Sequence, residues 1–215
     1  MRAPFGVLAL QGDFAAHATA FRDIGVPVRE VRRLAELEGL AGIVIPGGES
    51  TTFLNLMRDE PWFEGLRRLH DSGAVVAGTC AGAILLSRDV RPRQPSLALL
   101  DAVIERNAWG RQVDSFEARV DAPALGGPMD AVFIRAPRFR ALFPDVEVLA
   151  RYAGEPVLVQ QGRVVACTFH PELTSSRGLH RYLAGLARPG RRGLTSTRVA
   201  LGSAPPPSDS QRVQA

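Results

Sequence analysis

Residues 74–86, AVVAGTCAGAILL, limit what this chain can fold into more than any other segment. A valine-rich apolar run passes directly into a helix-like apolar run, and only the small residues Gly-Thr-Cys-Ala-Gly at 78–82 separate the two. A strand that becomes a helix without a spacer requires the helix to fold back over its own sheet. The segment therefore predicts a strand–helix corner in an α/β fold.

Short apolar runs and helix-like segments alternate through the rest of the first half. Strands are expected at 5–10, 26–31 and 42–45, and helices at 14–24, 51–57 and 62–69. Parallel strands joined by helices are covered on both faces, so they are apolar runs without polar alternation. The predicted fold class is α/β, with a three-layer, open, mainly parallel sheet flanked by helices.

The second half is mostly strand-like, with glycine-containing turns between several segments. Strands are expected at 99–106, 113–120, 131–136, 147–152, 156–161 and 163–170, and a last helix at 175–186. Close spacing predicts antiparallel strands added beside the parallel core. We expect one domain over residues 1–187. Arg, Gly, Ser and Pro dominate residues 188–215, which predicts a disordered Arg/Pro-rich tail.

The distribution of charge argues against a nucleic-acid partner. The formal net charge is +4, but residues 1–187 hold 21 Arg and 21 acidic residues, so the whole excess lies in the tail. A neutral domain with a short basic tail lacks the electrostatic footprint that a duplex needs. No apolar run approaches the ~18 residues of a membrane span, and the N-terminal segment resembles a strand more than a signal peptide. We therefore expect no membrane association and a cytoplasmic location.

Cys80, at the centre of the strand–helix corner, is the expected nucleophile. The pattern Gly-x-Cys-x-Gly is a nucleophile elbow with Cys in place of Ser, and it projects the thiol at the carboxyl edge of the sheet. The amide of Ala81 faces the same space and suits a developing oxyanion. Taken alone, a small buried cysteine at a tight turn remains the alternative. The chain has two cysteines, too few for a zinc site, and we expect no disulfide.

His170 is the histidine best placed to act as the base. It follows an apolar strand and precedes Pro171, and Glu172 two residues later can orient its ring. The other three histidines, His17, His70 and His180, lie in helix-like, partly charged segments, where surface or helix-end positions are expected. A structural strand-end histidine is the alternative for His170.

The loop PGGESTT at 46–52 is the third element of the expected site. It ends a strand with two glycines, whose backbone amides can supply a second oxyanion donor, and continues into Ser and Thr residues that cap helices. Without Cys80 this would be an ordinary helix-start loop.

Several motifs in chain order resemble one family. GTCAG followed by a late HPE resembles the class I, or triad, glutamine amidotransferases. The fuller set resembles the glutaminase subunits of pyridoxal 5′-phosphate synthases over roughly residues 5–186: LQG, PGGESTT, RN-x-x-GRQ-x-x-SFEA, FIRAP and TFHPELT. The resemblance implies a glutaminase (glutamine amidotransferase subunit) with a Cys-His-Glu triad.

The resemblance also implies roles for individual residues. Cys80, His170 and Glu172 match the triad, and Gly48 and Ala81 match the amides of the oxyanion hole. Gln11 matches a position tied to the partner interface and activation. The positions matching glutamine-binding residues are Gly48, Glu49, Ser50, Arg106, Ile134 and Arg135.

The implied reaction is hydrolysis of L-glutamine to L-glutamate and ammonia through a Cys thioester, with no metal and no organic cofactor. The ammonia would pass to a partner, the (β/α)8-barrel synthase subunit of pyridoxal 5′-phosphate (vitamin B6) biosynthesis, in a hetero-oligomer. The alternatives are another class I amidotransferase glutaminase, a Cys hydrolase or peptidase of similar fold, and a non-catalytic binding module.

Overall fold

The computed structural model describes residues 3–108 and 115–188. The predicted tail lies outside the described residues apart from Arg188, so the domain boundary at 187 stays a prediction. Residues 109–114, within the RN-x-x-GRQ-x-x-SFEA motif, are also outside the described residues.

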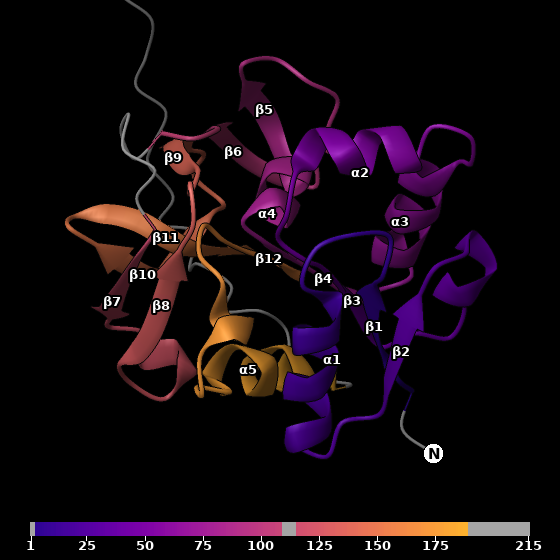
Figure 1. Cartoon of the computed structure of the whole chain (residues 1–215), viewed down its shortest axis with the longest axis horizontal. Helices are drawn as coiled ribbons and strands as arrows, with labels where there is room; N and C mark the ends of the chain where they lie inside the picture. The colour runs from indigo at the N-terminus through magenta and orange to yellow at the C-terminus, as the bar shows by residue number, and fades with distance from the viewer. Residues whose placement is uncertain (1–2, 109–114, 189–215) are drawn as a thin grey trace, which may run out of the picture.

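A seven-stranded sheet forms the middle of the molecule, in the order β10-β11-β12-β4-β3-β1-β2 (Figure 1). Its strands are β1 (Phe5–Leu8), β2 (Val28–Val31), β3 (Gly42–Ile45), β4 (Val75–Thr79), β10 (Glu147–Tyr152), β11 (Glu155–Gln161) and β12 (Val164–Cys167). The strands from β12 to β2 pair in parallel, while β10 and β11 pair antiparallel at one edge. The predicted fold class is confirmed.

Helices cover both faces of this sheet. α1 (Phe14–Asp23) and α5 (Gly178–Leu186) lie on one face, and α2 (Ser50–Leu56), α3 (Trp62–Asp71) and α4 (Ala81–Leu86) lie on the other. In β3, Ile43 and Ile45 join one apolar core and Val44 joins the opposite core, which is why the strand is apolar at every position. None of the described helices is long and apolar enough to cross a membrane.

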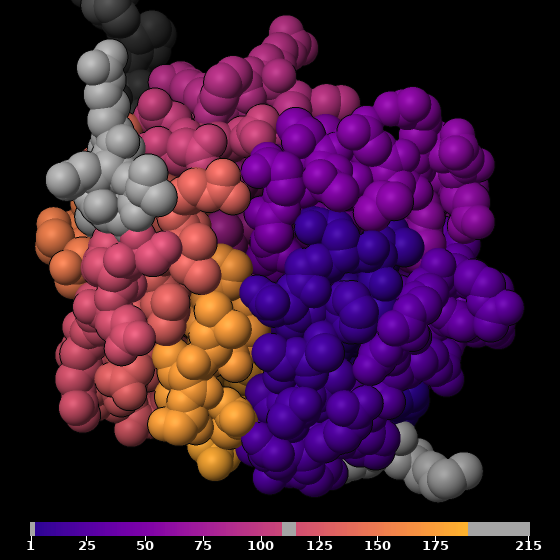
Figure 2. All heavy atoms as spheres, in the orientation of Figure 1, coloured from indigo at the N-terminus to yellow at the C-terminus, as the bar shows by residue number. Residues whose placement is uncertain are grey.

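The N-terminal and C-terminal helices meet although they are far apart in the sequence. α1 and α5 lie side by side (Figure 1), and the indigo and yellow segments meet along one seam in the space-filling view (Figure 2). Three short 3-10 turns complete the helical elements in the described part of the chain: η1 (Leu34–Leu37), η2 (Pro123–Leu125) and η3 (Pro171–Leu173). η3 contacts α1, so the seam reaches the segment that follows His170.

The second-half strands differ in detail from the expectation. Among the described strands of this half, only β10, β11 and β12 extend the main sheet; the others form a β5-β6-β9 sheet and a β7-β8 hairpin. These strands are β5 (Ser87–Arg91), β6 (Leu100–Glu105), β7 (Phe116–Val120), β8 (Met129–Phe133) and β9 (Arg138–Leu142). β5 and β9 were not predicted, because they lack long apolar runs. The last helix begins at Gly178, three residues after its predicted start.

The topology gathers chemistry-bearing residues at one edge of the sheet. The carboxyl ends of β1, β3 and β4 are followed by Gln11, the Gly47-Gly48 pair and Cys80 respectively, and β12 leads to His170. Ligands bind at this edge in open α/β sheets because the loops there converge.

Candidate active site

Cys80 occupies a strained corner between β4 and α4. Its backbone has φ 47° and ψ −103°, a conformation that a non-glycine residue adopts only when its surroundings enforce it. A Cβ atom at Gly78 would lie 2.4 Å from the carbonyl carbon of Gly82, and one at Gly82 would lie 2.0 Å from the carbonyl oxygen of Ile45. Glycines on both sides of Cys80 therefore let the helix pack tightly on the sheet and hold the thiol in place.

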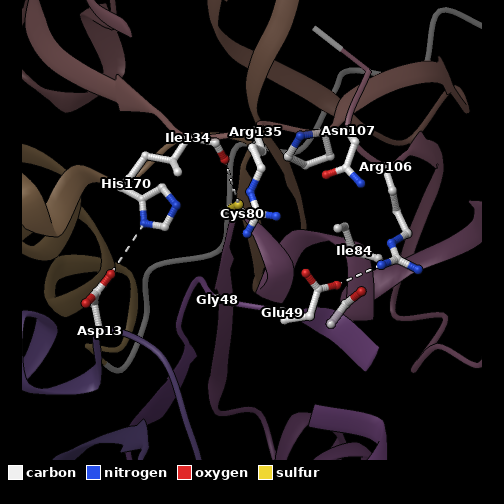
Figure 3. A pocket seen from close by; sticks show the side chains of 12 residues that line it. Asp13, Gly48, Glu49, Cys80, Ile84, Arg106, Asn107, Ile134, Arg135 and His170 are labelled. Atoms are coloured by element: carbon white, nitrogen blue, oxygen red, sulfur yellow. Dashed lines mark hydrogen bonds and ion pairs between the residues drawn. The ribbon is translucent and has the colours of Figure 1, made fainter. Parts of the chain in front are cut away.

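The imidazole of His170 faces the same cavity as this thiol (Figure 3). Its Nδ1 lies 2.8 Å from Oε1 of Glu172, which leaves Nε2 for the sulfur. Burial lowers the pKa of His170. Hydrogen bonds to Cys80 and Glu172 and the charges of both groups outweigh burial and raise the pKa to about 10. The thiol and the imidazole thus line one cavity and interact with each other, and the sulfur also lies 4.0 Å from the carbonyl oxygen of Ile134.

Glu172 is wholly buried and remains ionised. Burial alone would raise the pKa of its carboxyl group, but interactions with His17, and then with His170, hold that pKa well below its usual range. Nε2 of His17 lies 3.2 Å from Oε2 of Glu172. The carboxylate thus stands between two imidazoles, one on each oxygen.

The positions expected for His17 and His180 were wrong. Both are buried, because α1 and α5 turn them inward to the seam, and their rings lie within hydrogen-bond distance of each other. His70, whose side chain is 31% exposed near the end of α3, is at the surface as predicted. The missed signal was helical spacing: His17 shares a face with Phe14 and Phe21, which are apolar.

A cavity of about 150 Å³ opens in front of the thiol. All six residues predicted to bind substrate line this cavity: Gly48, Glu49, Ser50, Arg106, Ile134 and Arg135. Asp13 and Asn107 also line it, although no role was predicted for either residue. The structure thus brings the predicted substrate-binding residues together with Cys80 and His170.

Opposite charges stand together at the side of the cavity away from His170 (Figure 3). The guanidinium of Arg106 donates to Oε1 of Glu49 at 2.7 Å. Such a pair matches the carboxylate and ammonium groups of an amino acid. Ser50 is buried, and its hydroxyl donates to the side-chain oxygen of Gln94 at 3.0 Å, which ties the start of α2 to a neighbouring loop.

The side chain of Gln11 is hydrogen-bonded to the backbone of the glycine loop at Glu49. Its side-chain amide donates to the carbonyl of Glu49 at 3.3 Å, and its carbonyl accepts from the amide of Glu49 at 3.4 Å. Gly48 has φ 127°, and a Cβ atom there would lie 2.4 Å from the Gln11 carbonyl oxygen, so glycine is required. Ala81 follows Cys80 as the first residue of α4. The oxyanion-hole roles of Gly48 and Ala81 stay predictions.

Asp13, His170 and Glu172 are the described residues that come closest to a metal-binding group, with one ligand atom from each within 4.8 Å of the others. Nδ1 of His170 already faces Glu172 at 2.8 Å, and Asp13 lies 4.0 Å from the same nitrogen. The cluster is accounted for as a hydrogen-bonded triad with a second carboxylate nearby, and we assign no metal to it.

Comparison with known proteins identifies the family. The model of the SNO glutamine amidotransferase family matches residues 7–185. The chain belongs to this family. Pyridoxal 5′-phosphate synthase subunit PdxT of Thermus thermophilus is 52% identical over 190 residues, covering 87% of this chain and 99% of that protein. The subunit of the same name from Deinococcus radiodurans is 49% identical, covering 85% and 96%.

Solved structures agree with this family membership. A glutamine amidotransferase crystal structure that is 49% identical covers 85% of this chain and 98% of its own, with a TM-score of 0.81. A glutamine amidotransferase from Thermotoga maritima is only 13% identical, with a TM-score of 0.57, and supports the fold alone. The resemblance of the sequence motifs to the glutaminase subunits of pyridoxal 5′-phosphate synthases is confirmed.

Proposed function

We propose that this chain hydrolyses L-glutamine to L-glutamate and ammonia and passes the ammonia to a synthase subunit that makes pyridoxal 5′-phosphate. The observation that carries the proposal is that Cys80 and His170, the latter hydrogen-bonded to Glu172, line one cavity together with the Glu49–Arg106 ion pair. Membership of an amidotransferase family and near 50% identity to pyridoxal 5′-phosphate synthase subunits support it.

The first half of the reaction forms a thioester. Sγ of Cys80 attacks the side-chain amide carbon of glutamine, and the oxyanion that develops is held by the amides of Gly48 and Ala81. The carbon–nitrogen bond breaks as the imidazolium of His170 gives its proton to the leaving nitrogen, which departs as ammonia. Glu172 keeps the ring oriented and stabilises its positive charge.

The second half returns the enzyme to its starting state. A water molecule gives a proton to the now neutral His170 and attacks the thioester carbon. The carbon–sulfur bond breaks, glutamate is released, and the thiol–imidazole pair is restored. The Arg106–Glu49 pair would hold the α-carboxylate and α-ammonium groups of the substrate throughout.

Two substitutions test the assignment of the triad. Cys80→Ala and His170→Asn should abolish glutamine hydrolysis while the fold, followed by circular dichroism, is retained. Glutamate release is measured with the barrel synthase present. A folded variant of either kind that keeps its glutaminase activity would refute the triad.

Partner dependence tests the subunit assignment. Ammonia is mostly protonated at neutral pH and is then a poor nucleophile, so a protected transfer to the synthase is useful only when the two subunits are docked. Hydrolysis should therefore rise many-fold when the barrel synthase is added to the chain. Equal activity of the free chain would favour a different class I amidotransferase. The cytoplasmic location stays a prediction.

A further inference from the structure

A buried row of polar groups continues behind the catalytic carboxylate. Nε2 of His17 lies 3.2 Å from Oε2 of Glu172 and 3.2 Å from the hydroxyl of Thr79. Nδ1 of His17 lies 3.0 Å from Nε2 of His180. His17, His180 and Thr79 are each at most 1% exposed, so water has no access to these contacts.

Every member of this row comes from a different element. His17 is on α1, His180 on α5, Thr79 at the end of β4 beside Cys80, and Glu172 in η3. The row therefore crosses the seam between the two helices, where the N-terminal and C-terminal segments meet (Figure 2). Polar groups buried at such a junction are costly unless each one has a partner.

The positions of the protons follow from this requirement. His180 is neutral, because burial lowers the pKa of its imidazole well below the usual value. A neutral imidazole carries one N–H, and Nδ1 of His180 has no hydrogen-bond partner among the described residues. An unpaired buried N–H costs more than an unpaired lone pair on a ring nitrogen, so we assign the proton to Nε2, facing His17.

The position of the ring proton of His17 then follows from that of His180. Its Nδ1 accepts from His180, so its own N–H is on Nε2, which faces Thr79 and Glu172. Oε2 of Glu172 has no well-aligned hydrogen-bond donor among the described residues, so its contact with His17 is mainly electrostatic. Even so, Nε2 of His17 lies 3.2 Å from that oxygen, so its N–H turns the positive end of a dipole toward the carboxylate.

We propose that His17, held in its Nε2–H form by His180, is a positioning residue that supports Glu172 from the side opposite His170. It would keep the carboxylate ionised and fixed in the orientation that aligns the catalytic imidazole. The proposal rests on the proposed glutaminase function for its effect on rate, but its proton assignment stands independently of any substrate.

Nuclear magnetic resonance tests the proton assignment on the unaltered chain. The sequence has four histidines, so ring-labelled histidine gives four sets of signals, which single His→Gln variants assign. At neutral pH the ring nitrogen shifts of His17 and His180 should both report the neutral Nε2–H form. A doubly protonated His17, or the Nδ1–H form at either residue, would overturn the proposal.

The groups that affect this measurement are known from the structure. Glu172, His180 and Thr79 face His17, Arg177 acts on His180 through its charge, and Cys80 and Asp13 face His170. In His17→Leu the carboxylate is no longer held in its orientation, so its hydrogen bond to His170 weakens and the pKa of His170 should fall from about 10. His17→Gln retains an N–H donor, so the pKa of His170 should stay closer to the original value. An unchanged His170 pKa in a folded His17→Leu variant would contradict the proposal.

Kinetics in the complex with the barrel synthase provide the second measurement. For His17→Leu we expect kcat for glutamine hydrolysis to fall about 10–100-fold, as when other outer partners of oriented histidines are removed. The KM should stay within about twofold, because His17 lies outside the substrate cavity. His17→Gln should recover most of the rate, and the surface substitution His70→Gln should leave it unchanged.

Failure of the proposed function can be told apart from failure of the positioning role of His17. If the unaltered complex releases no glutamate, the proposed function fails while the proton assignment can still hold. If the complex is active and folded His17→Leu matches the unaltered rate, the positioning role fails and the function stands. His180→Phe, which can keep the edge contact with the Phe21 ring, should reproduce the His17→Leu loss if the tautomer matters.

Discussion

A single methyl group at Gly47 should displace the catalytic imidazole. Gly47 contacts the face of the His170 ring: a Cβ atom at this position would lie 2.2 Å from Cε1, 2.8 Å from Nδ1 and 3.1 Å from Nε2. The φ angle of Gly47 lies outside the left-handed region, and the three atoms nearest to an added Cβ all belong to the His170 ring. Gly47→Ala is therefore a steric probe of one contact.

The size of the effect follows from these distances. Ordinary carbon–carbon contacts begin at roughly 3.4–3.5 Å, so the ring must retreat by about 1.2 Å. A movement of this size lengthens either the 2.8 Å hydrogen bond to Glu172 or the contact with the Cys80 thiol. Misplacing a reacting group by about 1 Å costs on the order of 100-fold in rate. Overpacking should also lower the free energy of unfolding by about 1–3 kcal/mol, which leaves most molecules folded.

The assay compares kcat and KM for glutamine hydrolysis in the complex with the synthase. We expect a loss of about 100-fold in kcat for Gly47→Ala, with a much smaller change in KM. Gly178→Ala is the matched control, because its added Cβ meets its nearest neighbour, the Leu125 carbonyl, at an ordinary 3.4 Å. If Gly47→Ala turns over at a rate close to that of the control, the ring is not held where the structure has it.

Three further results are expected. The pKa of His180 is lowered to about 3, so this residue stays neutral in the folded protein, whereas in the unfolded chain it takes up a proton below about pH 6.5. The cost of His180 to folding stability therefore grows as the pH falls, to about 2 kcal/mol at about pH 5. Denaturant unfolding of His180→Phe should lack that loss of stability. Arg106→Met should raise the KM for glutamine about 10-fold or more with a smaller change in kcat, since Glu49 remains but the partner for a carboxylate is gone, and steady-state kinetics measure this. Gly82→Ala places a Cβ 2.0 Å from the Ile45 carbonyl oxygen, and because backbone cannot yield as a side chain does, thermal unfolding should show a clear drop in melting temperature.

The parts of the fold that could be predicted are those in which local chemistry and tertiary position agree. The corner at Cys80 was predictable because a strand, small residues and a helix follow one another without a spacer. Such a sequence is compatible with one local structure, a tight strand–helix turn. β3 was predicted to the residue because Pro46 and two glycines end its apolar run. By contrast β9 has arginines at alternate positions and is paired through β6, so its apolar pattern is weak.

The candidate site was predictable only where a motif carried it. Cys80, His170 and Glu172 were found because their spacing has a chemical meaning on a strand end. His17 and His180 were not, because the sequence shows which residues share a helix face but not which two helices will meet. The pairing of α1 with α5 across the seam is a property of the assembled sheet, and a buried histidine pair becomes visible only with it.

The short segment from Gln11 to His17 contacts several parts of the site. Gln11 clamps the backbone of Glu49, Gly12 lies so close to the Gly47 carbonyl that a Cβ would be 1.8 Å away, and His17 contacts Glu172. A small shift of this segment therefore changes the glycine loop and the support of the triad together. Since catalysis is sensitive to displacements of about an ångström, a shift of this segment is expected to change the rate of glutamine hydrolysis.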